Sequence, residues 1–286
     1  MYLSNIIVNF NNSNLLIECI DSIYKTVKGI KHEIIVVNNS ALDDGIKAVK
    51  QNFSKTKLIQ NEINVGFAKA NNQAAKLAKG DILLFLNPDI ILTGGAVSSM
   101  LTYYNSIQNI GVLGPKMFDI DGTLQYSCRS FPSVWTGLFN RYSLMSKLFP
   151  NNRYTKKYLL ADSDHNEIKE VDWLSGSCMM ISRNIFLKVG LFDENYFIFN
   201  EDVDLCKRMK SHGYKIIYYP NSKVYHHITS SNARVSSKVI IERHMGMCYY
   251  FKKHHRENIF VRCFINFFVM LRCLSQLIIN LFRSSC

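Results

Sequence analysis

The chain has little proline and no closely spaced cysteine pair. It contains five prolines among 286 residues and no repetitive or low-complexity stretch, which excludes an extended or disordered class of protein. Its eight cysteines are scattered, without the C-x-x-C pairs of zinc knuckles. We therefore expect neither a structural zinc site nor a disulfide framework, and the free thiols favour a reducing compartment.

A secretory signal is also missing from the start of the sequence. No basic segment precedes an apolar core there, and Ile6, Ile7 and Val8 already belong to a predicted first strand. Hydrophobic residues make up 48% of the chain, which is enough to bury the core of one large domain or of a domain with an appendage. We expect a cytoplasmic protein.

Acidic residues are nearly absent from the last part of the chain. From Leu205 to Cys286 there are 14 lysines and arginines against only Glu242 and Glu257, whereas 20 basic and 20 acidic residues precede Leu205. The whole net charge of +12 therefore lies at the C-terminal end, and it indicates an anionic partner: nucleic acid, an acidic membrane or a diphosphate-bearing substrate. Because this region is apolar and has no recognisable reading motif, we do not expect nucleic acid.

Residues 259–282 are apolar over a length that could span a bilayer. Polar residues interrupt this segment on a single helix face, within an arc of about 120°. They are Arg262, Asn266, Arg272, Gln276, Asn280 and Arg283. Because charges are costly inside a spanning helix, we expect an interfacial helix with its apolar side in the lipid and its arginines toward lipid phosphates. The alternative is a helix packed on the rest of the chain or on a second copy.

The first 115 residues alternate between strand-like and helix-like segments. Strands are predicted at residues 5–10, 33–37, 57–60, 82–86 and 111–114, and helices lie between them. This alternation is typical of an α/β fold with a mostly parallel sheet. After Pro115 the pattern changes. There we predict a hairpin at residues 121–122, a helical insertion at 142–160 and a strand at 173–181 that Gly176 interrupts. These are followed by helices at 183–189 and 201–211 and by a strand at 215–219 that Pro220 ends.

Polar side chains follow three of the predicted strands or open the next helix. Asn87, Pro88 and Asp89 end a continuous apolar strand, and an acid there can hold a divalent cation against a phosphate. Asn38 and Asn39 follow the second strand, and the segment Asn64-Val65-Gly66 precedes a helix whose free N–H groups favour a diphosphate. Each of these is also ordinary turn chemistry, but their common placement at the carboxyl edge of a sheet favours a nucleotide site.

A second cluster of acids lies at residues 201–204. Glu201 and Asp204 are explained by charge complementarity at a helix N-terminus. Asp202 follows an apolar segment, and partial burial there raises the pKa of a carboxyl toward that of a general base. His226 and His227 follow the last predicted strand, where a histidine pair is more often structural than metal-bound.

In this order and spacing, the motifs resemble those of glycosyltransferase family 2, and in particular its rhamnosyltransferase-like branch. The resemblance runs from about Ile6 to His227. The residues that carry it are Asn64-Val65-Gly66-Phe67-Ala68, Asn71-Asn72, Leu86-Asn87-Pro88-Asp89, Trp173-Leu174-Ser175-Gly176-Ser177-Cys178, Gly190-Leu191-Phe192-Asp193-Glu194, Glu201-Asp202-Val203-Asp204-Leu205-Cys206 and His226.

The resemblance implies a GT-A fold: a Rossmann-like, mostly parallel sheet with flanking helices. It implies a glycosyltransferase domain over residues 1–228, with a nucleotide-sugar half (1–115) and an acceptor half (116–228). Residues 229–286 would then be a basic, amphipathic helical tail that associates with an anionic membrane.

The resemblance also implies the site residues. Asp202 would be the catalytic base, and Asp89 with His226 would hold Mg²⁺ or Mn²⁺ on the donor diphosphate. The implied donor-binding residues are Asn38, Asn39, Asn64, Gly66, Asn71, Asp81, Asn87 and Asp89. The implied acceptor-binding residues are Trp173, Gly176 and Glu201, although a tryptophan in this position is equally compatible with a core residue.

The expected enzyme is a metal-dependent, inverting transferase. It would move a sugar, rhamnose first of all, from a dTDP- or UDP-linked donor to a glycan or a polyisoprenyl-diphosphate-linked acceptor during polysaccharide synthesis at the inner face of the membrane. Two departures from the family pattern matter: Asn87 replaces the first acid of the D-x-D motif, and Asn38 stands where an aspartate is more common. The alternatives are transfer of another hexose, galactofuranose or an amino sugar, and a non-catalytic membrane-bound subunit.

Overall fold

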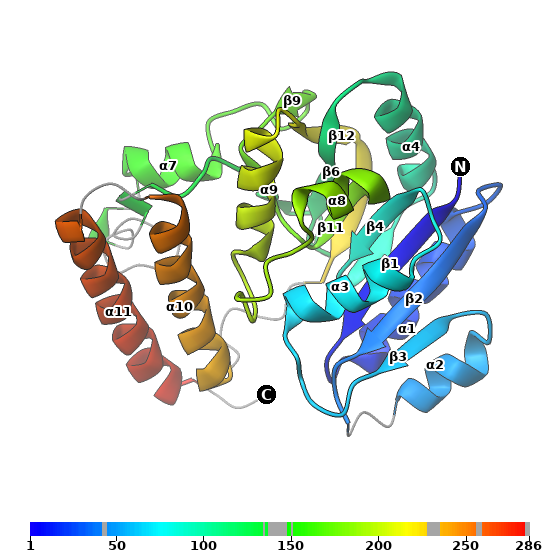
Figure 1. Ribbon diagram of the computed structural model, residues 1–286, viewed down its shortest axis with the longest axis horizontal. Coiled ribbons are helices and arrows are strands. Elements are labelled where there is room, and N and C mark those ends of the chain that lie inside the picture. The colour runs from blue at the N-terminus through cyan, green and yellow to red at the C-terminus, as the bar shows by residue number, and fades with distance from the viewer. Residues whose placement is uncertain are drawn as a thin grey trace.

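The computed structural model describes residues 1–41, 45–133, 135–136, 148–149, 151–227, 235–255 and 259–283. It confirms the predicted α/β class (Figure 1). Among the described residues, ten strands form one sheet with a main order of β3-β2-β1-β4-β11-β6-β12-β5.

The first half of the sheet is parallel, as the sequence predicts. It contains β1 (Leu3–Asn9), β2 (His32–Asn38), β3 (Lys57–Gln60) and β4 (Ile82–Leu86). Every residue of β1 and β4 is buried, because helices cover both faces of a sheet of this kind. The carboxyl ends of these strands therefore meet at one edge of the sheet.

The second half of the sheet is mixed. Its strands are β5 (Ile90–Leu92), β6 (Ile110–Phe118), β7 (Leu124–Gln125), β9 (Lys169–Glu170), β11 (Cys178–Ser182) and β12 (Lys215–His226). β11 runs antiparallel to β4, whereas β12 runs parallel to β6. A separate pair is formed by β8 (Cys128–Arg129) and β10 (Trp173–Leu174).

Helices cover the sheet on two sides. One hydrophobic cluster contains α1 (Ser13–Thr26), α2 (Ile46–Asn52) and α4 (Ala96–Ser106). The other cluster contains α3 (Phe67–Leu77), α8 (Arg183–Val189) and α9 (Glu201–Ser211). Residues 142–147 and residue 150 of the helix predicted at 142–160 lie outside the described residues, and the last part of that range forms α7 (Arg153–Leu159).

The prediction that Pro220 ends its strand is wrong. β12 continues to His226, and the register between β12 and β6 shifts between Tyr219 and Lys223. A proline cannot donate to a sheet ladder, but it is tolerated at a bulge of this kind. The extra length matters for the site because it pairs His226 with Ile90 on β5.

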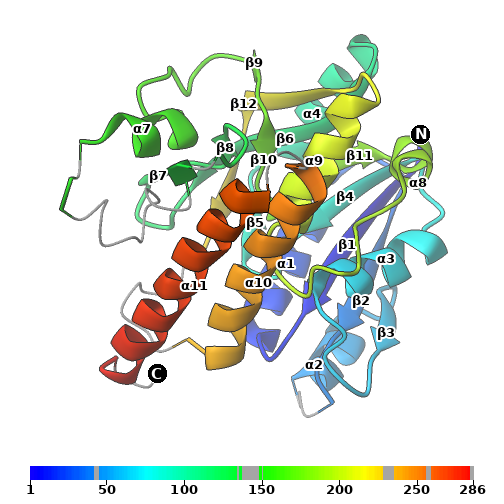
Figure 2. The ribbon, with the colours of Figure 1, turned by 60° about the vertical axis from the view of Figure 1, so that its left-hand side comes forward.

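The C-terminal segment contains two helices, α10 (Ser237–His254) and α11 (Ile259–Leu281), which lie side by side, with α10 next to α9 (Figure 2). Tyr250 and Phe251 on α10, and Ile265 and Val269 on α11, belong to the same hydrophobic cluster as α9 and one face of the sheet. The tail predicted for residues 229–286 thus shares its core with the α/β domain.

Helix α11 turns a mixed face to the protein, where Arg272 and Asn280 lie beside Ile265 and Val269, and an apolar face outward. Arg272 and Asn280 are buried: Arg272 Nε donates to His244 Nε2 at 3.0 Å, and Asn280 Nδ2 donates to the carbonyl of Val235 at 2.7 Å. On the opposite face Phe260 is 79% exposed, and Phe267 is 63% exposed. The expectation that the arginines of this helix face lipid phosphates is therefore wrong for Arg272, which faces α10 instead.

By length and composition, α11 could cross a membrane, although only 22% of its most apolar window is buried inside the protein. The face of α11 that contains Arg272 and Asn280 agrees with the alternative prediction, in which this helix packs on the rest of the chain. The apolar face remains as a continuous exposed surface.

Candidate active site

Amide side chains line the carboxyl ends of β1 and β2. Asn9 Nδ2 donates to Asn38 Oδ1 at 3.0 Å, and Asn38 Nδ2 donates to the carbonyl of Ser40 at 2.7 Å and to Gln60 Oε1 at 3.0 Å. Asn38 is buried, and its polar atoms are bonded to neighbouring protein groups. Asn38 therefore holds its neighbours together at the carboxyl edge of the sheet, where the sequence predicts a nucleotide site.

Asn39 connects the carboxyl end of β2 to the loop before α3. Its Nδ2 donates to Asn64 Oδ1 at 2.9 Å and to the carbonyl of Gly66 at 3.2 Å, while its Oδ1 accepts from Asn61 Nδ2 at 2.9 Å. Asn64 Oδ1 also accepts the N–H of Gly66 at 2.9 Å. Three of the predicted donor-binding residues, Asn39, Asn64 and Gly66, are thereby brought together at one edge of the sheet.

Gly66 is required where it stands. Its φ is +89°, in the left-handed region, and a Cβ atom there would lie 2.6 Å from the carbonyl oxygen of Phe197. The same oxygen accepts the N–H of Phe67 at 2.7 Å, so this first N–H of α3 is already bonded. The segment at Phe197 thus packs directly on the loop of residues 64–66, which the sequence predicts to bind the donor and which we call the donor loop.

Two predicted donor-binding residues lie elsewhere. Asn71 is buried within α3, where its Nδ2 donates to the carbonyl of Phe67 at 2.9 Å. The assignment of Asp81 to the donor site is wrong. Asp81 precedes β4 and accepts the N–H of Tyr2 at 2.9 Å, at the amino edge of the sheet. The five residues of β4 lie between Asp81 and Asn87, so six residue steps separate the two by about 20 Å, because a strand rises about 3.3 Å per residue.

The end of β4 is joined to the start of β11 through Asn87 and Ser177. The N–H of Asn87 donates to the carbonyl of Ser177 at 2.9 Å, and Asn87 Nδ2 donates to Ser177 Oγ at 3.3 Å. Ser177 Oγ lies 3.0 Å from Ser175 Oγ. Asn87 therefore has a structural role where most D-x-D motifs carry an acid. It fixes Ser175-Gly176-Ser177, which we call the serine-rich turn, against the end of β4.

Asp89 and His226 are brought together by the pairing of β5 with β12. His226 Nε2 lies 3.2 Å from Asp89 Oδ1, and the N–H of His227 donates to the carbonyl of Asp89 at 2.9 Å. Although Asp89 Oδ1 is buried and close to the ring, it accepts no hydrogen bond from any residue that the structure describes. The pair predicted from the sequence as metal ligands is thus assembled, and one of its oxygens lacks a donor.

Gln125, which the sequence analysis did not single out, fixes the ring of His226. Gln125 Nε2 donates to the main-chain carbonyl of His226 at 2.8 Å, so its Oε1 is the atom that faces His226 Nδ1, also at 2.8 Å. An amide oxygen only accepts, so Nδ1 carries the proton. In the neutral ring the Nε2 lone pair therefore points at a carboxylate oxygen, an arrangement that a cation between them would stabilise.

The chemistry of this pair fits a divalent cation that is shared with a substrate. Among the described residues, no group of three or more His, Cys, Asp or Glu side chains is placed to hold a metal ion. Mg²⁺ and Mn²⁺ that serve phosphorylated substrates commonly take one or two protein ligands and complete their coordination with water and phosphate oxygens. Asp89 and His226 are sufficient for such a site.

Asp202 is anchored at the start of α9 by the glycine of the serine-rich turn. The N–H of Gly176 donates to Asp202 Oδ2 at 2.9 Å, and the N–H of Val203 donates to Oδ1 at 2.8 Å. Burial raises the pKa of this carboxyl, and these N–H groups with the Arg129 guanidinium act in the opposite direction. A carboxylate with a raised pKa and a fixed orientation suits a general base.

Glu201 is more deeply buried than Asp202. Burial, together with the negative charge of the neighbouring Asp202, raises its pKa well above the usual range, and its Oε2 has no hydrogen-bond partner within the described part of the chain. Two adjacent carboxyls with unequal environments therefore open α9, and Glu201 is the one that stays protonated to higher pH.

Trp173 is a core residue. It is 5% exposed, and its indole N–H donates to the carbonyl of Ser130 at 2.8 Å. The guanidinium of Arg129, its cross-strand partner, lies 5.0 Å from its ring centroid. The core alternative for Trp173 thus describes its position, and Arg129, another residue that sequence reasoning missed, is the polar group above its ring.

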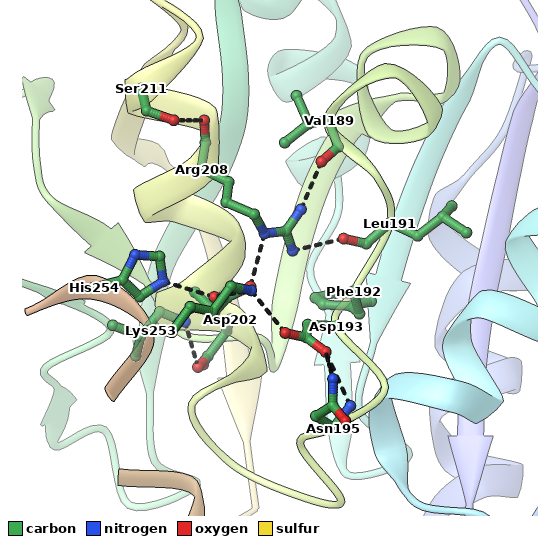
Figure 3. A network of polar contacts seen from close by, with 12 residues as sticks. Val189, Leu191, Phe192, Asp193, Asn195, Asp202, Arg208, Ser211, Lys253 and His254 are labelled. Atoms are coloured by element: carbon green, nitrogen blue, oxygen red, sulfur yellow. Dashed lines mark hydrogen bonds and ion pairs between the residues drawn. The ribbon is translucent and has the colours of Figure 1, made fainter. Parts of the chain in front are cut away.

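A polar network ties α10 to α9, and Figure 3 shows Arg208 of α9 and Lys253 and His254 of α10 in it. Asp204 Oδ2 pairs with Arg208 Nε at 2.7 Å, and Oδ1 lies 2.7 Å from both Lys253 Nζ and His254 Nε2. Lys253 also reaches Asp193 at 2.7 Å. The structural role predicted for Asp204 therefore extends beyond its own helix.

The fold and this arrangement define a glycosyltransferase of the GT-A type. Two solved structures support the fold: GalNAc-T7 with UDP, GalNAc and Mn²⁺ (TM-score 0.60, 18% identity, 81% of this chain and 44% of that chain), and a mannosyltransferase of Pyrobaculum calidifontis with GDP-Man and Mn²⁺ (TM-score 0.59, 16% identity, 99% and 76%). The chain thus spans less than half of the first of these.

The chain belongs to glycosyl transferase family 2, whose family model matches residues 4–190; the model of glycosyl transferase family group 2 matches residues 123–283. It is 28% identical to the N-acetylglucosaminyl-diphospho-decaprenol L-rhamnosyltransferase of Mycobacterium tuberculosis over 78% of this chain and 75% of the relative. It is 26% identical to a rhamnosyltransferase of Escherichia coli K12 over 73% and 78%. The resemblance inferred from the motifs is confirmed, including its rhamnosyltransferase-like character.

Proposed function

We propose that this protein transfers a sugar, with rhamnose as the first candidate, from a nucleotide diphospho-sugar to a hydroxyl of a lipid-linked glycan, with inversion at the anomeric carbon. The serine-rich turn carries this proposal. Ser177 Oγ accepts a hydrogen bond from Asn87 at the end of β4, and the N–H of Gly176, one residue earlier, donates to the carboxylate of Asp202. The serine-rich turn thus connects the candidate base with the carboxyl end of β4, where we expect the donor to bind.

The residues of the site have distinct chemical tasks in this reaction. Asp89 and His226 would hold Mg²⁺ or Mn²⁺, which, when bound, offsets the negative charge that grows on the leaving nucleoside diphosphate. Asp202 takes the proton from the acceptor hydroxyl as that hydroxyl attacks the face of the sugar opposite the leaving group. The N–H groups of Gly176 and Val203 keep the carboxylate aimed during the transfer.

Glu201 and Arg129 complete the acceptor side. Glu201 is buried directly beside Asp202, so a proton held on its carboxyl leaves Asp202 as the single charged carboxylate of the pair. Arg129 sits above Trp173, where a fixed guanidinium suits a hydroxyl-rich or anionic acceptor. We assign these two residues to acceptor orientation.

The names of relatives support the sugar and the acceptor. Two of them are rhamnosyltransferases, and the mycobacterial one acts on a diphospho-decaprenol-linked sugar. A hexosyltransferase of Haloferax volcanii, 26% identical over 73% of this chain and 61% of the relative, keeps transfer of another hexose as the alternative. Lipid-linked acceptors reside at the membrane, where the exposed apolar face of α11 would hold the enzyme peripherally at the inner surface.

A donor screen tests the proposal. The full-length protein is incubated with Mn²⁺, dTDP-rhamnose, UDP-sugars or GDP-mannose, and polyisoprenyl-diphosphate-linked N-acetylglucosamine, and products are read by mass spectrometry. We expect one rhamnosylated product with inverted configuration. A different sugar in the product would retain the transferase and correct the donor. No transfer, together with no metal-dependent thermal shift by any nucleoside diphosphate, would favour a non-catalytic subunit.

A further inference from the structure

The two residues before α9 adopt an unusual backbone conformation. Phe199 and Asn200 both have positive φ, at 66° and 69°, although neither is glycine. Consecutive left-handed residues with side chains are sterically costly and persist only where the surrounding structure holds them. This turn leads directly into Glu201 and Asp202, so its conformation sets the direction from which the candidate base enters the site.

Helix α10 packs against this turn at closest range through a glycine. A Cβ atom at Gly246 would lie 3.0 Å from Asn200 Nδ2 and 3.3 Å from the carbonyl oxygen of Phe199. The same Asn200 Nδ2 donates to the carbonyl of Arg243, one turn earlier on α10, at 3.4 Å. The Arg243 guanidinium lies 4.3 Å from the ring centroid of Phe199. Both left-handed residues are therefore contacted by one face of α10.

The segment that contains the turn also touches the donor loop. The carbonyl of Phe197 accepts the N–H of Phe67 and lies where only a glycine fits at position 66. The ammonium group of Lys238, near the start of α10, lies 4.3 Å from the ring centroid of Phe197. Residues 197–200 thus form a bridge with the donor loop on one side, α10 on the other and Asp202 at its end.

Helix α10 is itself anchored at two places. Lys253 and His254 pair with the buried carboxylate of Asp204 near its C-terminal end. In its middle, His244 is buried and accepts a hydrogen bond from Arg272 of α11. Because α10 is fixed on both sides of Gly246, its contact with the turn cannot relax by a simple shift of the whole helix.

We infer that Gly246 is a positioning residue for the transfer reaction: its missing side chain lets α10 clamp the Phe199–Asn200 turn, which aims Asp202 at the acceptor hydroxyl. This inference rests on the proposed function of Asp202. The three atoms nearest to a Cβ at Gly246 belong to Asn200, Phe199 and Tyr196, so its role lies in the direction of the base.

The variant Gly246→Ala tests this role. Alanine favours the helix more than glycine does, so a substitution that met open space would leave the fold at least as stable. Here the new methyl group displaces Asn200 by a few tenths of an ångström. We expect kcat to fall at least ten-fold, with KM for the donor and the affinity for nucleoside diphosphate unchanged within two-fold. We also expect the pH profile of kcat to shift upward, because Asp202 moves away from the N–H of Gly176.

A second substitution should rescue the first. Asn200→Gly removes the side chain that the methyl group strikes and adopts positive φ without cost. The double variant Gly246→Ala/Asn200→Gly should recover most of the lost kcat. Met245→Ala, on the exposed side of the same helix, is the matched control and should change kcat less than two-fold.

Three outcomes are distinguishable. Wild-type protein without any turnover contradicts the proposed function, and the inference is then decided by thermal unfolding, where positions 200 and 246 must show coupling in a double-mutant cycle. Active wild type with an equally active Gly246→Ala variant overturns the inference alone. If Gly246→Ala fails to fold, Asn200→Ala takes its place, because it loses the bond to Arg243 and keeps the cost of positive φ; unchanged kcat in that variant also overturns the inference.

Discussion

Gln125 orients His226 toward Asp89. Its amide donates to the backbone carbonyl of His226 and accepts from the ring Nδ1, both at 2.8 Å, so Nε2 is left facing the carboxylate at 3.2 Å. Because the two amide contacts come from one residue, the ring orientation and the tautomer are set together.

The first prediction concerns metal affinity. His226→Ala should abolish measurable Mn²⁺ binding in the presence of a nucleoside diphosphate, and Gln125→Met should weaken it by about 10–100-fold, the usual effect of removing a group that orients a ligand. Isothermal titration measures both affinities. Asp121→Asn, in the exposed hairpin next to Gln125, is the control for non-specific binding. Wild-type Mn²⁺ affinity in Gln125→Met would show that the ring needs no such support.

The second prediction concerns the base. Asp202→Asn keeps the size of the side chain and an oxygen for the N–H of Gly176 but removes the proton acceptor, so turnover should fall by about 10²–10⁴-fold. Donor affinity should stay within two-fold, because the predicted donor residues lie outside α9. Single-turnover kinetics separates the two quantities. Asp162→Asn, an exposed carboxylate far from α9 in sequence, should behave as wild type, and an active Asp202→Asn enzyme would assign the base elsewhere.

Much of the donor edge could be predicted from the sequence because its signals are local. The apolar strand that ends at Asn87-Pro88-Asp89 contains its own stop, and the parallel arrangement brings Asn39 and Asn64 to the same edge. The position of His226 depends on long-range pairing that the sequence does not display. β12 passes Pro220 at a bulge and pairs with β5, and no local pattern predicts that continuation.

The errors have a common physical origin. Asp81 and Asp89 flank the same strand, and a motif match alone does not tell which end of the strand faces the ligand. For α11, helical periodicity correctly divides a polar from an apolar face, but the inward direction is set by bonds such as that between Arg272 and His244. A buried polar partner on another helix lets Arg272 lie on the inward face beside the apolar Ile265 and Val269.

The third prediction uses the raised pKa of Glu201. In the unfolded chain this carboxyl ionises near its ordinary value of 4.5, whereas in the folded protein it holds its proton to higher pH. Stability is therefore lost as pH rises above about 4.5, by about 1.4 kcal/mol for each unit of pKa difference. Glu201→Gln should raise the melting temperature by a few degrees at pH 7.5 and by much less at pH 4. An equal effect at both pH values would contradict a protonated Glu201.

The fourth prediction uses Asp204, whose shift has the opposite sign. Burial alone would raise its pKa, but the hydrogen bond from His254, the charge of Arg208 and the hydrogen bond from Lys253 together lower it to about 2. Its contribution to stability is present above its ordinary value of 3.8 and is lost as pH falls toward 2.

Asp204→Asn should therefore destabilise the protein at pH 7 by about 3–5 kcal/mol, because Arg208 and Lys253 lose a buried carboxylate and His254 loses a hydrogen-bond partner. Denaturant unfolding at pH 7 and at pH 3 measures the difference, which should shrink at the lower pH. Asp193→Asn, which leaves Lys253 its contact with Asp204, is the comparison and should cost less. A difference that stays constant with pH would show that Asp204 contributes through packing.

The last prediction concerns the outward face of α11. Phe260, Phe267 and Leu274 are spaced by seven residues, so they lie along one exposed stripe, and the buried Arg272 lies on the opposite face. Burying one such side chain contributes about 1.5–3 kcal/mol. The triple variant Phe260→Ser/Phe267→Ser/Leu274→Ser should therefore reduce partitioning into anionic vesicles by at least about 100-fold, measured by sedimentation. The triple variant Ile63→Ser/Leu77→Ser/Ile120→Ser, which changes exposed apolar residues elsewhere, should partition as wild type. Unchanged partitioning of the α11 variant, with loss of a dimer in sedimentation velocity, would instead assign this face to a second copy of the chain.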